Sequence, residues 1–217
     1  MAMRRVFFVS LAVALSGAVV PGPLFAMTLY QARLVGWSAG IWIIVGHLLA
    51  ELAVVALLYA GLGAALKRPV VTRVIGLVGG AVLLYFAWEM ARTALLSGAL
   101  AGAAGGNALS ALGLVGQGLV LTLLNPYWYI WWATAGVALI AAQSARHGGR
   151  AWPVFFSGHI LGDYLWYQLV ALLIAVSGRF LSDGTFRGLI IACAAGVAAL
   201  GMWFIIGAAR PRPAGQA

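Results

Sequence analysis

The sequence predicts an all-α integral membrane protein whose six transmembrane helices form two inverted repeats of three helices each. Three observations predict this fold class. Hydrophobic residues make up 64% of the 217 residues and charged residues only 8%, which leaves too little polar surface for a water-soluble globule. Six stretches are long and apolar enough to cross a bilayer. One six-residue phrase occurs in each half of the chain, as GHLLAE at 46–51 and as GHILGD at 158–163.

The six predicted spans cover residues 6–28, 39–63, 74–92, 109–143, 153–177 and 188–208. Helix breakers interrupt two of them, Pro21-Gly22-Pro23 in the first and Asn125-Pro126 in the fourth, so we expect a broken helix in each. All six spans are assigned to one membrane domain, residues 1–217. It contains a first repeat at about 6–92, a mobile Ala/Gly-rich connector at 93–108, a second repeat at about 109–208 and a disordered tail at 209–217.

The basic residues are strung between the apolar segments rather than gathered on one face, so they indicate topology and not a nucleic-acid surface. With the N-terminus in the cytoplasm, the residues inside are Arg4, Arg5, Lys67, Arg68, Arg73, Arg146, Arg150, Arg210 and Arg212. Arg33, Arg92, Arg179 and Arg187 are then outside. Basic residues resist translocation, so this distribution predicts a multi-pass protein of the cell inner membrane with both termini cytoplasmic.

Two acids are expected to meet near the middle of the bilayer. Each repeat has an odd number of spans, so the second repeat enters the membrane upside down relative to the first. Glu51 and Asp163 lie about ten to twelve residues into their spans, close to mid-membrane at about 1.5 Å per residue. An ionisable group at that depth costs about 2.5 to 3.5 kcal/mol on insertion scales, which favours a functional role for both acids.

A histidine precedes each acid by four residues, His47 before Glu51 and His159 before Asp163, so each pair shares one face of a helix. Such a pair can be a proton relay or half of a metal site. It can also be an acid that is steadied by a hydrogen bond from the neighbouring imidazole. The sequence leaves these interpretations open.

The two helix breaks occupy corresponding positions in the two repeats. Backbone groups freed at the N-terminus of a half-helix carry positive dipole character and can hold an anionic group. A single break is explained by a plain proline kink, but the matched pair favours a binding site at Pro21, Gly22 and Pro23 and at Asn125 and Pro126.

Aromatic residues follow the second break, and they form either an interfacial belt or the wall of a site. They are Tyr127, Trp128, Tyr129, Trp131 and Trp132. Trp166, three residues beyond Asp163, is a further candidate for lining a pocket.

The chain resembles the lysine exporter family of small six-span amino-acid efflux proteins. The likeness covers nearly the whole chain and is carried by Pro21-Gly22-Pro23, Gly36, Gly40, Gly46, Asn125-Pro126, Gly158 and Asp163. It implies export of an amino acid or a close derivative from the cytoplasm, coupled to the proton gradient. The chain departs from the family pattern at Glu51, where an aspartate is more usual, and at the two histidines.

The resemblance leads to the hypothesis of proton antiport by alternating access. The broken ends near Gly22 and Asn125 would hold the substrate carboxylate, and Trp166 would line the site. Glu51 and Asp163 would bind the amino group or carry the exchanged proton. The expected partners are a small-molecule substrate, protons and the lipid bilayer, with no nucleic acid and no cofactor, and a homo-oligomer stays open.

A second hypothesis is export of a divalent transition-metal cation through His47, Glu51, His159 and Asp163, because imidazole and carboxylate together suit first-row metals. An enzyme is not expected, since no His-Glu-x-x-His motif occurs. Lys67, the only lysine, lies at a span end and offers no mid-membrane site for a Schiff base.

Overall fold

Helices make up nearly all of the described chain. The computed structural model describes residues 2–20, 22–58, 68–96, 108–177 and 182–210. The elements in chain order are α1 (Ala2–Ala18), α2 (Pro23–Val35), α3 (Ser38–Leu57), α5 (Pro69–Leu96), α6 (Ala111–Leu123), α7 (Pro126–Trp131), the π-helical turn η2 (Trp132–Gly136), α8 (Val137–His147), α9 (Ala151–Ser177) and α10 (Asp183–Ala209). The all-α prediction is confirmed.

Four of these helices, α3, α5, α9 and α10, are long and apolar enough to cross a membrane. Helices α1 and α2 together pass the same test as one bent span, in which the two helices meet at 81°. The predicted fourth span is divided among α6, which has 13 residues, and the helical run from α7 to α8. Residues 93–96, assigned to the connector, belong to α5; the rest of the connector up to residue 107 and the tail from residue 211 lie outside the described residues.

Both breaks begin a new helix at a proline. Helix α2 starts at Pro23 and α7 at Pro126, where the fixed φ of proline suits the first helical position and its missing N–H costs nothing. The Asn125 side chain caps α7 by accepting a hydrogen bond from the Tyr127 backbone N–H at 3.1 Å. No side chain caps α2, whose N-cap is Gly22. Pro21 lies outside the described residues.

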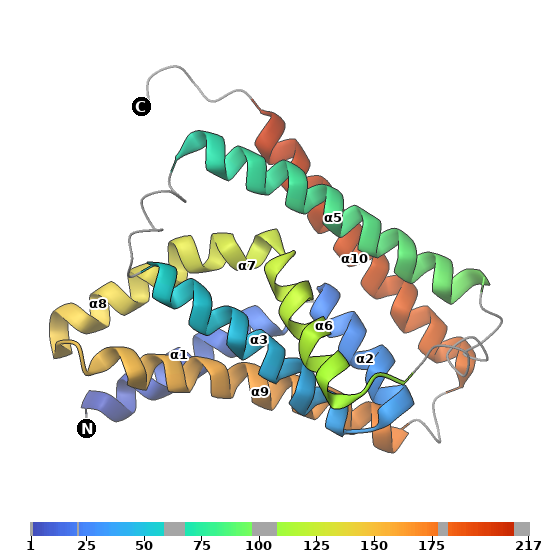
Figure 1. Ribbon diagram of the computed structural model, residues 1–217, viewed down its shortest axis with the longest axis horizontal. Coiled ribbons are helices and arrows are strands. Elements are labelled where there is room, and N and C mark those ends of the chain that lie inside the picture. Colours follow the sequence, from blue (N-terminus) through green and yellow to red (C-terminus); the bar gives the residue numbers. More distant parts are fainter. Residues whose placement is uncertain (1, 21, 59–67, 97–107, 178–181, 211–217) are drawn as a thin grey trace.

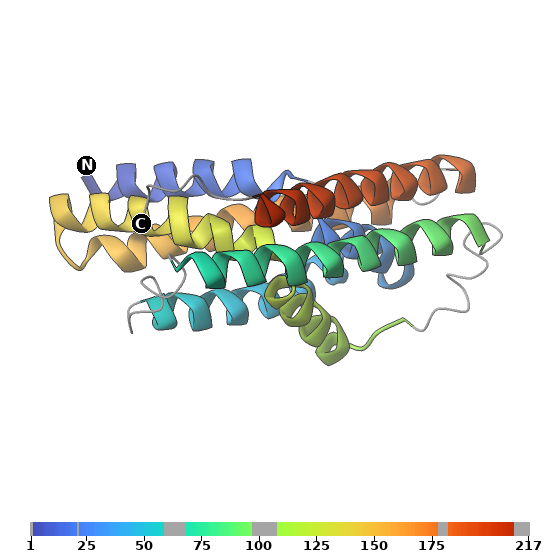
Figure 2. The same cartoon turned by 90° about the horizontal axis from the view of Figure 1, so that it is seen from above.

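The closest helix pairs each join one helix from before residue 97 to one from after residue 107. They are α1 with α9, α3 with α6, and α5 with α10, and the last pair runs along one edge of the molecule (Figure 1). Seen from above, most helices follow the long axis, whereas α6 runs obliquely (Figure 2). The main contacts of the edge pair with the rest of the protein are those with α2 and α7, the two helices that follow the breaks.

Glycines allow these helix pairs to approach closely. A Cβ added at Gly118 of α6 would collide with the Ile43 carbonyl of α3, and one added at Gly46 would collide with the Val115 carbonyl. Gly158 of α9 faces the Phe7 carbonyl of α1 in the same way. Small residues at contacts are what membrane helices use to bring their backbones together. The glycine that opens each repeated phrase therefore packs against the first helix of the other half.

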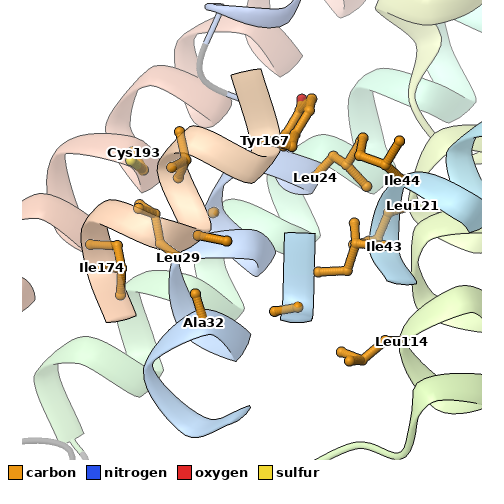
Figure 3. Packing of buried hydrophobic residues seen from close by; sticks show 14 of the residues in the cluster. Leu24, Leu29, Ala32, Ile43, Ile44, Leu114, Leu121, Tyr167, Ile174 and Cys193 are labelled. Carbon is orange, nitrogen blue, oxygen red and sulfur yellow. The ribbon is translucent and has the colours of Figure 1, made fainter. Parts of the chain in front are cut away.

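A buried apolar cluster is formed by residues of α1, α2, α3, α6, α9 and α10 (Figure 3). Leu24 and Leu29 come from α2, Ile43 from α3, and Leu121 from α6. Tyr167 of α9 belongs to this cluster and also lines a cavity beside it.

Candidate functional site

The two repeated phrases place four ionisable side chains in one ring, which we call the central ring: His47, Glu51, His159 and Asp163. Acids and imidazoles alternate around it. Glu51 Oε1 lies 3.3 Å from His47 Nε2 and 3.0 Å from His159 Nε2. Asp163 Oδ2 lies 3.7 Å from His47 Nε2 and 3.4 Å from His159 Nε2. The expected meeting of the two acids is therefore what the structure shows.

All four residues are buried, with 1% of Glu51 and 5% of Asp163 exposed. Buried charges are costly unless they are paired or hydrogen-bonded. Two carboxylates in one buried site repel each other unless protons or another cation lie between them. The central ring is therefore built to hold positive charge.

Thr122 of α6 fixes the tautomer of His47. The Thr122 hydroxyl donates its one proton to the Gly118 carbonyl at 2.7 Å, and it lies 2.9 Å from His47 Nδ1. It can only accept at that second contact, so His47 Nδ1 carries a proton and donates it. His47 Nε2 then faces both carboxylates and needs a proton or a cation in order to be attracted to them.

The two acids differ in how they are held. Glu51 Oε1 accepts hydrogen bonds from His159 Nε2 at 3.0 Å, from Trp132 Nε1 at 3.2 Å and, more weakly, from Trp128 Nε1 at 3.5 Å. Glu51 Oε2 and Asp163 Oδ2 are both buried and accept no well-formed hydrogen bond within the described part of the chain, so the acids differ in the N–H donors that Glu51 Oε1 alone receives. N–H donors stabilise a carboxylate, so the environment favours a fixed negative charge on Glu51 and leaves Asp163 open to a ligand.

The central ring borders a cavity of about 80 Å³, which has room for several water molecules or a small solute. The aromatic side chains on its wall are Tyr127, Trp128, Trp131 and Tyr167. The cluster that follows the second break thus contributes to the wall of this cavity. Trp131 also packs on His159, with 4.7 Å between the ring centroids.

The predicted residues at the breaks divide into two groups. Gly22 and Asn125 line the cavity beside the central ring. Pro23 and Pro126 do not line it: Pro23 borders a second cavity of about 260 Å³ together with Glu89, and Pro126 packs against Gly79 of α5.

Trp166 is not a wall residue of this cavity, so its expected place is corrected. Its ring stacks on Phe25 of α2, with 6.3 Å between centroids, and it packs against the apolar cluster. Tyr167, four residues after Asp163, lines the cavity instead. His159, Asp163 and Tyr167 recur every four residues along one face of α9, whereas a spacing of three turns Trp166 towards α2.

Sequence reasoning missed Thr122 and did not separate Trp132 from its aromatic neighbours. Thr122 is a hydroxyl in an apolar run one turn before the break, which is the signal that could have identified it. Trp132 is fully buried and reaches Glu51 from the π-helical turn η2. Such turns occur frequently at functional sites.

The central ring also meets the first requirement of a metal site. His47, Glu51 and Asp163 each offer one ligand atom, and these atoms lie within 4.8 Å of one another. The hydrogen bond from His47 Nδ1 to Thr122 is the outer support that a metal-binding imidazole usually has.

A family model described as LysE type translocator matches residues 15–208, a range that includes all four residues of the central ring. Neither the curated proteins nor the solved structures contain a significant match.

Proposed function

Because the chain belongs to the LysE type translocator family, and is thus a transporter, we propose that it exports an amino acid or a close derivative from the cytoplasm in exchange for protons. The observation that carries the proposal is the central ring, a buried set of two acids and two imidazoles at the edge of a cavity. Ionisable residues inside a membrane protein are typical of substrate sites and proton relays.

The substrate's ammonium group would bind at the central ring. Glu51 and Asp163 supply the negative charge, and an ammonium has three donors for their oxygens. Trp128 and Trp131 line the same cavity and add aromatic faces, which attract cations. A neutral solute would lack the Coulombic attraction that an ammonium gains from the two acids.

The substrate's carboxylate would bind at the start of α2 rather than at the start of α7. Both N-termini border the cavity through Gly22 and Asn125. The Asn125 side chain already occupies the first free N–H of α7, whereas no side chain caps α2. An uncapped helix N-terminus is a ready-made anion site, so the broken first span supplies the carboxylate pole.

Within the central ring, Asp163 would carry the exchanged proton and Glu51 would remain charged. Three N–H donors converge on Glu51 Oε1, while Asp163 Oδ2 has no comparable donor. Protonation of Asp163 removes half of the negative charge that attracts the ammonium. Proton binding and substrate binding thus oppose each other, as antiport requires.

Alternating access would use the two halves as inverted repeats. The pairing of α1 with α9 corresponds under that symmetry to the pairing of α6 with α3, and α5 pairs with its own counterpart α10. The edge pair α5 and α10 meets the rest mainly through α2 and α7, which begin at the two breaks beside the cavity. A movement at the breaks would therefore move the edge pair relative to the central ring. The protein would do this in the inner membrane, with both termini in the cytoplasm.

The function is tested with purified protein in proteoliposomes loaded with a panel of amino acids, their amides and divalent metals. We expect efflux of at least one amino acid, accelerated by a proton gradient, and weaker efflux of the matching amide because it lacks the carboxylate. Failure of every amino acid to leave the vesicles faster than from protein-free liposomes would contradict the proposal.

Replacement of Asp163 by Asn tests the proton role in the same vesicles. Asp163→Asn is expected to retain exchange of labelled for unlabelled substrate at equal pH, with a raised KM because half of the negative charge is removed, but to lose acceleration by the proton gradient. Asp183→Asn is the matched control. Asp183 forms an ion pair with Arg33, with 2.6 Å between the charged atoms, and neither residue lines the cavity. Gradient-driven efflux that survives in Asp163→Asn would assign the proton to another group.

Export of a divalent transition metal is the second candidate, favoured by the three ligand atoms within 4.8 Å. The metal content of the purified protein and the metal arm of the panel distinguish the two. Metal efflux that is lost in a His47→Ala, His159→Ala double variant but kept in His147→Ala would support this candidate. His147 is the third histidine of the chain and lies outside the central ring.

Thr122 tests whether the tautomer of His47 matters for transport. Thr122→Val keeps the shape of the side chain but removes the hydroxyl that holds His47 Nδ1. Loss of such an outer-shell contact usually costs on the order of 10- to 100-fold, and we expect a fall in the initial efflux rate in that range. Thr122→Ser keeps the hydroxyl and is expected to retain most of the rate. Equal rates for both variants would show that the contact is only structural.

A further inference from the structure

A groove lies where the first turns of α5 meet the last turns of α10. The two helices are antiparallel, so the beginning of one lies beside the end of the other (Figure 1). The groove encloses about 430 Å³ and carries two arginines, Arg73 from α5 and Arg210 from the end of α10. We call it the α5–α10 groove. None of its residues belongs to the central ring.

No side-chain carboxylate in the described part of the chain neutralises the positive charge of the α5–α10 groove. The chain has four acids, all in its described part. Two are in the central ring, and Glu89 and Asp183 each form an ion pair with an arginine outside the groove. The N-terminus of α5 and the C-terminus of α10 meet here with opposite dipole ends, so the charge of the groove comes from the side chains of Arg73 and Arg210.

Below the arginines the groove is apolar. Gly76 and Gly207 contribute no side chains to its floor, and nothing lies within 4 Å of the position where a Gly207 side chain would begin. Val70 and Trp203 stand on its borders and are largely exposed. Exposed tryptophan is typical of the level at which lipid headgroups meet the hydrocarbon.

We propose that the α5–α10 groove binds one anionic phospholipid. Its phosphate lies between Arg73 and Arg210, and one acyl chain follows the glycine floor. Basic pockets between transmembrane helices on the cytoplasmic side are suited to acidic headgroups, and the charge distribution of the chain places this end in the cytoplasm. An acyl chain explains the apolar floor, which a free phosphate ion does not require.

The test uses full-length protein in a neutral detergent and native mass spectrometry with phosphatidylglycerol or phosphatidylcholine. We expect one molecule of phosphatidylglycerol to be retained in preference to phosphatidylcholine. In an Arg73→Gln, Arg210→Gln double variant the affinity for phosphatidylglycerol should fall on the order of thirtyfold. The matched control is Arg146→Gln, Arg150→Gln, which removes two exposed arginines, one in the last turn of α8 and one in the turn that follows it, and should leave the affinity unchanged.

Gly207→Leu fills the floor without a change of charge. It is expected to lower the affinity for phosphatidylglycerol on the order of tenfold, because about two methylene groups of the acyl chain lose their place. The melting temperature of each variant without lipid shows that it is folded. Transport is not measured, so the outcome is independent of the proposed function.

Three results would overturn the proposal. The first is equal retention of phosphatidylglycerol by native protein and the Arg73, Arg210 double variant. The second is an equal loss in the α8 control, which would indicate general attraction of acidic lipid to basic residues. The third is displacement of the lipid by millimolar inorganic phosphate together with full binding in Gly207→Leu, which would make the groove a phosphate site.

Discussion

Replacing Glu51 by Gln is expected to abolish both gradient-driven efflux and exchange at equal pH. Glu51 is the acid on which three N–H donors converge, and it is 1% exposed. The amide keeps the size of the side chain but removes its charge, so His159 and the substrate ammonium lose their counter-ion. Removal of one partner from a buried ion pair costs about 3 to 5 kcal/mol, which corresponds to a loss on the order of 10²- to nearly 10⁴-fold.

Glu89→Gln is the matched control for this experiment. Glu89 is the only other glutamate, and it pairs with Arg92 at 2.8 Å near the end of α5. Initial rates of efflux and exchange in proteoliposomes measure both variants. The contrast with Asp163→Asn matters most, because that variant is expected to keep exchange. If Glu51→Gln also kept exchange, the two acids would not have the separate roles proposed here.

Gly118→Val is expected to lower the stability of the protein strongly. A side chain at Gly118 would collide with the backbone of α3 at Ile43, and backbone atoms cannot turn aside as a flexible side chain can. Helices α3 and α6 must then separate. Overpacking typically costs about 1 to 3 kcal/mol and occasionally more, and we expect the upper end of that range or beyond.

The matched control is Gly116→Val, on the same helix two residues earlier. Nothing lies within 4 Å of a Cβ at Gly116, so the same change of residue type meets open space. Thermal unfolding in detergent is the measurement, and we expect a clear fall in the melting temperature for Gly118→Val alone. Similar melting temperatures for the two variants would contradict the close contact of α3 with α6.

The repeated phrase predicted the residues of the central ring because its geometry is local. A separation of four residues puts His47 and Glu51 on one helix face regardless of the rest of the fold. Burial cost then explains why two such faces turn towards each other rather than towards lipid. The all-α class was likewise predictable, because it followed from the apolar composition and from the length of the apolar stretches.

Contacts that depend on how separate helices are placed were not predictable. Thr122 reaches His47 only because glycines bring α6 against α3, and Trp132 reaches Glu51 from a π-helical turn. The error at Trp166 has a different origin. Neighbours at three and at four residues from Asp163 point in directions that differ by about 100°, and only the packing of α2 decides which of them meets the cavity.

The pairing of helices across the two halves bears on how the protein is made. During synthesis, α1, α3 and α5 enter the bilayer before α9, α6 and α10 exist. At about 5 to 20 residues per second, the early helices wait on the order of ten seconds with their glycine faces against lipid. Glu51 of the first half therefore meets His159, Trp128 and Trp132 only once the second half has been synthesised.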